Sequence, residues 1–299
     1  HRGGRARGGQ EGHRGQAHAR DHPKQGRGPD REAQVCGGRC GGGRRTALPR
    51  RSRTLRDGAR GGARRPRPGA RRERERGRGE RVDRIAQVLV HDLGLVPGNR
   101  VLLRGGNSIG LALAWMGVVK AGLVAVATMP LLRAKELSEI IAKAQPSVAL
   151  CDATLLNELE LAQQQQAVLT TIVPFNLMDA PGSLAVRAAA HDGDFSACPT
   201  HADDIAMLAF TSGTTGTPKA AAHSHRDILS ACEAWPRHVL RATPDDVVMG
   251  SPPLAFTFGL GGLLVFPMWA GCSVYFPDAP YTPEAMVKMI AQVGATICY

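Results

Sequence analysis

The residues with the clearest chemical potential are the nine from Thr211 to Lys219, which read Thr-Ser-Gly-Thr-Thr-Gly-Thr-Pro-Lys. They follow an apolar run at 205–210 that is typical of a buried strand. Glycines let backbone N–H groups turn toward an anion without a Cβ in the way. Hydroxyl groups add short hydrogen bonds, and a lysine adds a compact positive charge. This combination at the end of a strand predicts a loop that binds phosphate.

The loop does not fit the Walker A motif, which requires Gly, four residues, and then Gly-Lys-Ser/Thr. Counting from Gly213, Pro218 stands where the second glycine should be, and Ala220 follows the lysine. The nonapeptide instead resembles the phosphate loop of the adenylate-forming superfamily, which includes acyl-CoA synthetases, adenylation domains of peptide synthetases and luciferases. The alternative is a polar turn that happens to be rich in Thr and Gly.

Further segments resemble the same superfamily, in the same order along the chain. Residues 117–122 resemble its helix-to-strand signature, to which we assign a structural role. Residues 245–254 resemble the strand that leads to the aromatic gate of the family. Residues 252–262 resemble the aryl-CoA ligase branch, above all 2-aminobenzoate–CoA and benzoate–CoA ligases. The resemblance covers residues 82–299 and none of 1–81.

The resemblance implies an enzyme that joins an aromatic carboxylate to ATP, with Mg²⁺, and then passes the acyl group to coenzyme A. The alternative within the same superfamily is an acyl-CoA synthetase for a fatty or other acid. Donors aimed at the β- and γ-phosphates would stabilise the charge that builds up as pyrophosphate leaves. In this reading Thr217 and Pro218 shape the turn. The residues expected to bind the nucleotide phosphates are Thr211, Ser212, Gly213, Thr214, Thr215, Gly216 and Lys219.

The resemblance also implies a site for the acid near three residues of the later apolar run. Phe256 aligns with the gate aromatic of the family, and Phe258 follows two residues on. Gly259 would leave room for a flat ring, which would pack against either phenylalanine. The alternative is that both phenylalanines are ordinary core residues. No metal-ligating side chain is expected in this chain.

The composition divides the chain sharply at about residue 81. Residues 1–81 contain 24 Arg and 1 Lys against 8 acidic residues, so the formal net charge of +12 arises entirely in this segment. Its only large aliphatic residues are Val35, Leu48 and Leu55, and it has no Phe, Tyr or Trp. Such a segment cannot bury enough apolar surface to offset the entropy of ordering, so we expect disorder.

Three interpretations of the basic segment compete. It could be an arm that binds nucleic acid through phosphates, which would make the protein a non-enzymatic binding protein. It could be a targeting peptide, although it has one serine and eight acidic residues. The third interpretation, which we favour, is that this segment is the out-of-frame translation of GC-rich coding DNA. We therefore do not expect a nucleic-acid partner.

From residue 82 onward, short apolar strands alternate with helical patterns, which is typical of an α/β fold with a doubly wound, mostly parallel sheet. The resemblance identifies this part as a large N-terminal AMP-binding domain that is incomplete, with the small C-terminal domain and its catalytic lysine lying beyond Tyr299. We therefore expect an inactive fragment. The expected strands are 101–103, 123–127, 148–150, 170–174, 205–210, 247–249, 273–276 and 295–299. The expected helices are 82–93, 110–121, 134–144, 159–167, 224–240, 259–269 and 283–293.

The cysteines and the lengths of the apolar runs indicate in which cellular compartment the protein is expected. Seven cysteines are scattered without pairing or metal spacing, and Cys36 and Cys40 have no second ligand pair. No apolar run reaches the length of a membrane span. We expect a cytoplasmic protein with reduced, buried thiols and no membrane partner.

Overall fold

The computed structural model describes residues 68–211, 218–277 and 282–299. The chain divides into two units, His1–Ala59 and Arg60–Tyr299, and every described residue belongs to the second. The expectations for residues 1–67, including disorder, a basic arm and the cysteines at 36 and 40, lie outside the described residues.

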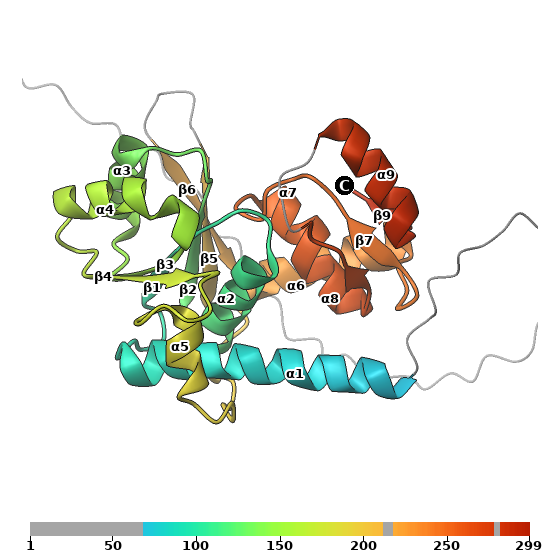
Figure 1. The fold of residues 1–299 in the computed structure, drawn as a ribbon, viewed down its shortest axis with the longest axis horizontal. Helices are drawn as coiled ribbons and strands as arrows, with labels where there is room; N and C mark the ends of the chain where they lie inside the picture. The colour runs from blue at the N-terminus through green and yellow to red at the C-terminus, as the bar shows by residue number, and fades with distance from the viewer. Residues whose placement is uncertain (1–67, 212–217, 278–281) are drawn as a thin grey trace, which may run out of the picture. The chain divides into compact units, whose positions relative to one another are not determined.

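Strands of the second unit form two sheets (Figure 1). The strands are β1 (Arg100–Arg104), β2 (Val124–Thr128), β3 (Val148–Asp152), β4 (Thr171–Phe175), β5 (Ile205–Thr211), β6 (Lys219–Ser224), β7 (Val247–Met249), β8 (Ser273–Val274) and β9 (Ile297–Cys298).

Helices and helical turns connect these strands. They are α1 (Pro68–Gln87), η1 (Val88–Asp92), α2 (Ile109–Lys120), α3 (Ala134–Ala144), η2 (Ala153–Leu155), α4 (Leu156–Gln165), α5 (Leu184–Ala189), α6 (His225–Ala234), η3 (Trp235–Leu240), α7 (Thr257–Leu260), η4 (Gly261–Val265), α8 (Phe266–Ala270) and α9 (Pro283–Val293). The turn η2 is a 3₁₀-helix, and η1, η3 and η4 are π-helical.

The larger sheet has the strand order β4-β3-β1-β2-β5-β6. All neighbours in it pair parallel except β5 and β6, which pair antiparallel. The smaller sheet, β8-β7-β9, is parallel. The α/β class with mostly parallel sheets is therefore confirmed.

Parallel sheets need cover on both faces, and β1 shows how this chain supplies it. Successive side chains of a strand point to opposite faces. Val101 and Leu103 pack with α1 and α2, whereas Leu102 packs with α3 and α4. All three side chains are fully buried. Figure 1 shows α3 and α4 on one side of the sheet and α1, α2 and α5 on the other, as a doubly wound sheet requires.

Helix α1 begins at Pro68, well before the expected start at Val82. The stretch 68–81, which composition assigned to the disordered segment, forms the first part of this helix instead. Its residues from 71 onward are mainly Arg and Glu, which are good helix formers. Glu80 and Arg84, four residues apart, form an ion pair of 2.7 Å on the helix surface.

Three other expectations about local structure need correction. No strand was expected between the predicted phosphate loop and the helix at 224–240, but residues 219–224 form β6, which pairs with β5. No helix was expected between the strands at 170–174 and 205–210, but this stretch contains the short helix α5. The single helix expected at 259–269 is interrupted by the π-helical turn η4.

The turn from α2 into β2 confirms the structural role expected for residues 117–122. Gly122 adopts a left-handed φ of 73°, which a side chain would disfavour. Its N–H donates to the carbonyl of Val119, and the N–H of Leu123 donates to that of Val118. These bonds satisfy the last carbonyls of the helix and send the chain directly into the sheet.

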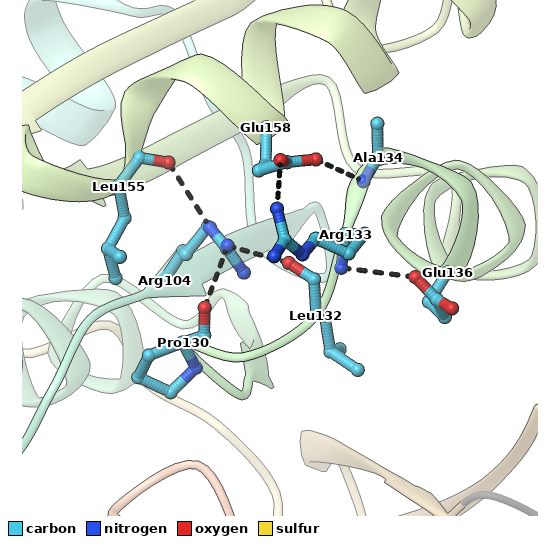
Figure 2. Close-up of polar contacts among 8 residues, drawn as sticks. All are labelled: Arg104, Pro130, Leu132, Arg133, Ala134, Glu136, Leu155 and Glu158. Carbon is cyan, nitrogen blue, oxygen red and sulfur yellow. Dashed lines mark hydrogen bonds and ion pairs between the residues drawn. The ribbon is translucent and has the colours of Figure 1, made fainter.

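Arg104, the last residue of β1, has a buried guanidinium that donates to four main-chain carbonyls, and Figure 2 draws those of Pro130, Leu132 and Leu155. The distances are 2.8 Å to Met129, 3.0 Å to Pro130, 2.8 Å to Leu132 and 3.3 Å to Leu155. Three of these acceptors lie in the loop after β2, and the fourth lies after β3. One side chain therefore ties together two loops at the carboxyl edge of the sheet.

Backbone dipoles satisfy the charge of Arg104 through direct hydrogen bonds, and the nearby Glu158 carboxylate adds a weaker favourable Coulombic interaction. Burial lowers the pKa of this guanidinium, yet arginine stays charged in proteins. Cys151 lies beside it on β3, but burial raises the pKa of that thiol to about 12, so it stays neutral. Because a buried charge is costly unless it is hydrogen-bonded, the four carbonyls must remain in place.

The first turn of α3 is capped by two carboxylates that Figure 2 also shows. Glu136 accepts a hydrogen bond of 3.0 Å from the Arg133 backbone N–H. Glu158, from α4, accepts from the Ala134 N–H at 2.8 Å and from the Arg133 side chain at 3.0 Å. Negative charge near the free N–H groups of a helix stabilises it.

Within the described ranges, no helix combines the length and the apolar character that crossing a bilayer would need. The thiols of Cys151 and Cys232 are buried as expected, but Cys198 and Cys272 are half-buried and Cys298 is exposed.

Replacing Arg104 with methionine should destabilise the fold by about 3 kcal/mol or more, because buried carbonyls lose their donor. Urea unfolding followed by circular dichroism measures this change. Arg226→Met is the matched control, since Arg226 forms an exposed ion pair with Asp203 and its replacement should cost much less stability. Equal, small effects of the two substitutions would refute the role given to Arg104.

Replacing Glu158 with glutamine should lower stability at neutral pH, and the loss should disappear in acid. The hydrogen bond from the Ala134 N–H, followed by that from Arg133, holds the pKa of Glu158 below its ordinary value of 4.5. A carboxylate of this kind stabilises the fold above the unfolded pKa and loses that effect as pH falls through the folded pKa. The urea midpoints of the variant and the native chain should therefore converge as the pH falls from 4.5 through the lowered pKa of Glu158. Glu139→Gln, on an exposed position of α3, is the control. A gap that stays constant between pH 7 and 3 would rule out the carboxylate charge as its cause.

Candidate functional site

The predicted phosphate loop joins β5 to β6, which form an antiparallel hairpin. The register ends with Thr211 opposite Lys219, and both residues are exposed. Directly opposed residues carry their side chains on the same face of a sheet. The structure thus brings together the first and last residues of the predicted loop. Ser212, Gly213, Thr214, Thr215 and Gly216 lie outside the described residues.

The hairpin is attached to the parallel sheet through β5. Strand β5 pairs parallel with β2, so its carboxyl end points the same way as those of β1 to β4. Ligands of open α/β sheets bind outside this carboxyl edge. Lys143, in the last turn of α3, donates a hydrogen bond of 3.0 Å to the carbonyl of Pro218, just before Lys219. This contact, which the sequence pattern did not reveal, ties the end of the loop to α3.

The exit from β6 is equally well defined. Ser224 caps α6: its hydroxyl accepts from the Asp227 N–H at 3.2 Å, and the Asp227 carboxylate accepts from the Ser224 N–H at 2.8 Å. The hydrogen bond from the Ser224 backbone N–H, followed by one from the Ser224 side chain, lowers the pKa of Asp227. Both ends of β6 are therefore held by hydrogen bonds to helices.

The three residues expected to contact the acid lie together at the start of α7. Phe256 is the N-cap of this helix and is 43% exposed, and Phe258 is 64% exposed. Phe258 meets Tyr299 edge to face, with ring centroids 5.9 Å apart. Neither phenylalanine belongs to the core that the described residues form, so the alternative of plain core packing does not hold for them.

The reason for glycine at position 259 differs from the one expected. A Cβ there would lie 2.0 Å from the Pro253 carbonyl oxygen and 2.6 Å from that of Pro252. The space beside Gly259 is therefore filled by backbone and is not left open for a flat ring. The glycine allows α7 to approach the preceding segment closely.

Asn107 connects the segment before α7 to the larger sheet. It lies in the loop between β1 and α2, and its side-chain amide donates to the Pro252 carbonyl at 2.9 Å. Its amide oxygen accepts from the Leu254 N–H at 2.7 Å. Sequence reasoning placed Asn107 in a loop but missed this partnership, and the only signal was an asparagine directly after a strand and two glycines.

The hairpin and the α7 region share one hydrophobic core. Met207 and Ala209 of β5 belong to the same buried cluster as Leu254 and Leu260, which flank Phe256 and Phe258. In the part of the chain that the structure describes, no three His, Cys, Asp or Glu side chains come together in a way that could hold a metal ion.

Known proteins resemble this chain in sequence and in fold. The benzoate–CoA ligase of Thauera aromatica is 29% identical over 221 residues, which is 73% of this chain and 41% of that protein. The crystal structure of an anthranilate CoA ligase in complex with anthranoyl-AMP superimposes with a TM-score of 0.70 and 28% identity, over 75% of this chain and 44% of that one. ATP-bound MatB from Rhodopseudomonas palustris gives a TM-score of 0.65 and 29% identity, over 74% and 42% of the two chains.

This chain spans less than half the length of each of these relatives. The matched part contains both sheets, the predicted phosphate loop and the start of α7. Because residues 78–299 match the model of the family described as AMP-binding enzyme, the chain belongs to that family.

Proposed function

We propose that this chain provides the phosphate- and acid-binding parts of an AMP-forming acid–thiol ligase that acts on an aromatic carboxylic acid of the benzoate or 2-aminobenzoate type. The observation that carries the proposal is the pairing of Thr211 with Lys219 at the end of a hairpin joined to a parallel sheet. A relative that acts on benzoate and a similar structure that contains anthranoyl-AMP support the substrate class. A similar structure that contains ATP supports the nucleotide.

In the proposed first step, a carboxylate oxygen of the acid bonds to the α-phosphorus of ATP, and the bond to the β-phosphate oxygen breaks. Pyrophosphate leaves with the electron pair, so negative charge grows on its oxygens. Lys219, the hydroxyls of Thr211, Ser212, Thr214 and Thr215, and the N–H groups of Gly213 and Gly216 are proposed to donate to them. In the second step the thiolate of coenzyme A attacks the acyl carbon, and AMP leaves.

The proposed role of the α7 region is to receive the ring of the acid. Phe256 and Phe258 present aromatic surface outside the core of the described residues, where a ring can stack or pack edge-on. Mg²⁺ is implied by the family, but the described residues bring together no group of acidic side chains that fits it. We therefore propose no step that depends on it. A cytoplasmic location is part of the same proposal.

Binding of two stable mimics of the acyl-AMP intermediate tests the proposal. 5′-O-(N-benzoylsulfamoyl)adenosine should bind this chain more tightly than the octanoyl analogue, as measured by isothermal titration calorimetry. Preference for the octanoyl compound would favour a ligase for aliphatic acids instead. Binding of neither compound would count against the site as a whole.

Replacing Lys219 with alanine should weaken ATP binding about tenfold or more, because a charge-assisted hydrogen bond contributes about 1.5–3 kcal/mol. Equilibrium dialysis with labelled ATP measures the dissociation constant. Lys288→Ala removes an exposed lysine from α9 and serves as the control. An unchanged dissociation constant in the Lys219 variant would remove this residue from the phosphate site.

Replacing Phe256 with leucine should reduce the preference for benzoate over cyclohexanecarboxylate by about threefold to tenfold, since an aromatic pair adds about 0.5–1.5 kcal/mol beyond area burial. The ratio of the two dissociation constants is the readout. Phe195→Leu changes a phenylalanine beside His91 and should leave that ratio unchanged. The same ratio in the native chain and in the Phe256 variant would exclude ring contact with Phe256.

A further inference from the structure

Asn107 uses both ends of its side-chain amide on one short stretch of backbone. The amide nitrogen donates to Pro252 and the amide oxygen accepts from Leu254, over separations of 145 and 147 residues in the sequence. The two hydrogen bonds resemble those between paired β-strands, with the Asn107 amide in place of the backbone of a partner strand. A primary amide, as in Asn and Gln, offers an N–H donor and a carbonyl acceptor side by side without carrying a charge at neutral pH.

The backbone that Asn107 contacts has few hydrogen-bonding groups of its own. Pro252 and Pro253 lack an N–H, and their rings restrict φ, so the segment is stiff and poor in donors. Asn107 takes both the Leu254 N–H and the Pro252 carbonyl, whereas the Pro253 carbonyl accepts from the Phe256 N–H within the same turn. Leu254 itself is buried, so its N–H would be costly to leave without an acceptor.

This held segment determines where Phe256 lies. The Phe256 N–H donates to the Pro253 carbonyl at 3.0 Å, which closes a tight turn directly onto the segment. On the other side, Gly259 packs so closely on Pro252 and Pro253 that α7 cannot shift independently of them. A displacement of the Pro252–Leu254 backbone would therefore move Phe256 with it.

Asn107 is itself well anchored. The next residue, Ser108, caps α2 by accepting from the Leu111 N–H at 3.2 Å. Three residues earlier, Arg104 is held by its four carbonyl partners. Asn107 therefore lies between two residues that hydrogen bonds hold in place, so it can fix the position of the backbone that it contacts.

We propose that Asn107 is a positioning residue that fixes Phe256 for contact with the ring of the acid. The part of this proposal that concerns the acid rests on the proposed function. The two hydrogen bonds by which Asn107 holds residues 252–254, here called the clamp, do not depend on it. The residue acts through Phe256 and does not touch the reacting atoms.

Hydrogen exchange of the full 299-residue chain, followed by mass spectrometry, tests the clamp without any ligand. In Asn107→Ala, exchange in peptides spanning 250–258 should accelerate about tenfold or more, while peptides from β2 and α3 keep the native rate. Asn107→Asp retains the acceptor for Leu254 but sets a carboxylate against the Pro252 carbonyl, so it should also accelerate exchange there. Asn99→Asp is the matched control, because Asn99 accepts from Val96 in a distant turn. Native exchange at 250–258 in both Asn107 variants would overturn the clamp.

Ligand binding to the same variants tests the second part. Asn107→Asp should weaken binding of 5′-O-(N-benzoylsulfamoyl)adenosine about fivefold or more and leave ATP binding within about twofold of native. A loss of affinity shared equally by both ligands would mean a general structural defect and would overturn the positioning role. If the native chain does not bind the benzoyl compound, the proposed function and the role of Asn107 toward the acid both fail. The hydrogen-exchange result still tests the clamp separately.

Discussion

The buried positive charge of Arg104 constrains the carboxyl edge of the larger sheet more than any other single interaction described here. A guanidinium removed from water needs hydrogen-bond partners, and this one donates to main-chain carbonyls in the loops after β2 and β3. Carbonyls of two separate loops can converge on one side chain only if both loops adopt a single arrangement. The charge therefore specifies loop geometry, which hydrophobic packing alone would leave free.

Three residues at the end of the central strand connect different parts of the molecule. Arg104 reaches the loops of its own sheet, Asn107 reaches the segment that follows β7 of the other sheet, and Ser108 starts α2. Because β1 is buried on both faces, its carboxyl end is a rigid place from which to set these contacts. The edge of the fold that faces the proposed ligands is organised from this one strand end.

The two parts of the proposed site depend on this arrangement in different ways. Thr211 and Lys219 are brought together by strand pairing, which needs only the β5–β6 register. Phe256 is brought to its place by a longer chain of contacts, from Asn107 through Pro252–Leu254 to the turn before α7. The shared core of Met207, Leu254 and Leu260 then joins the two parts.

The sequence by itself determined the α/β class and the bounds of α3, β7 and α9, which agree with the expected ranges. It also predicted a phosphate loop at Thr211–Lys219, because apolar periodicity, glycine and proline signals and short motifs are all local properties. Only the tertiary structure decided that the alanines of β6 form a strand, that Gly259 meets the backbone of Pro253, and that Asn107 binds a segment 145 residues away. The physical reason is that such partners are chosen by strand order and by the packing of crossovers, which bring distant backbone together and leave no trace in the spacing of neighbouring residues.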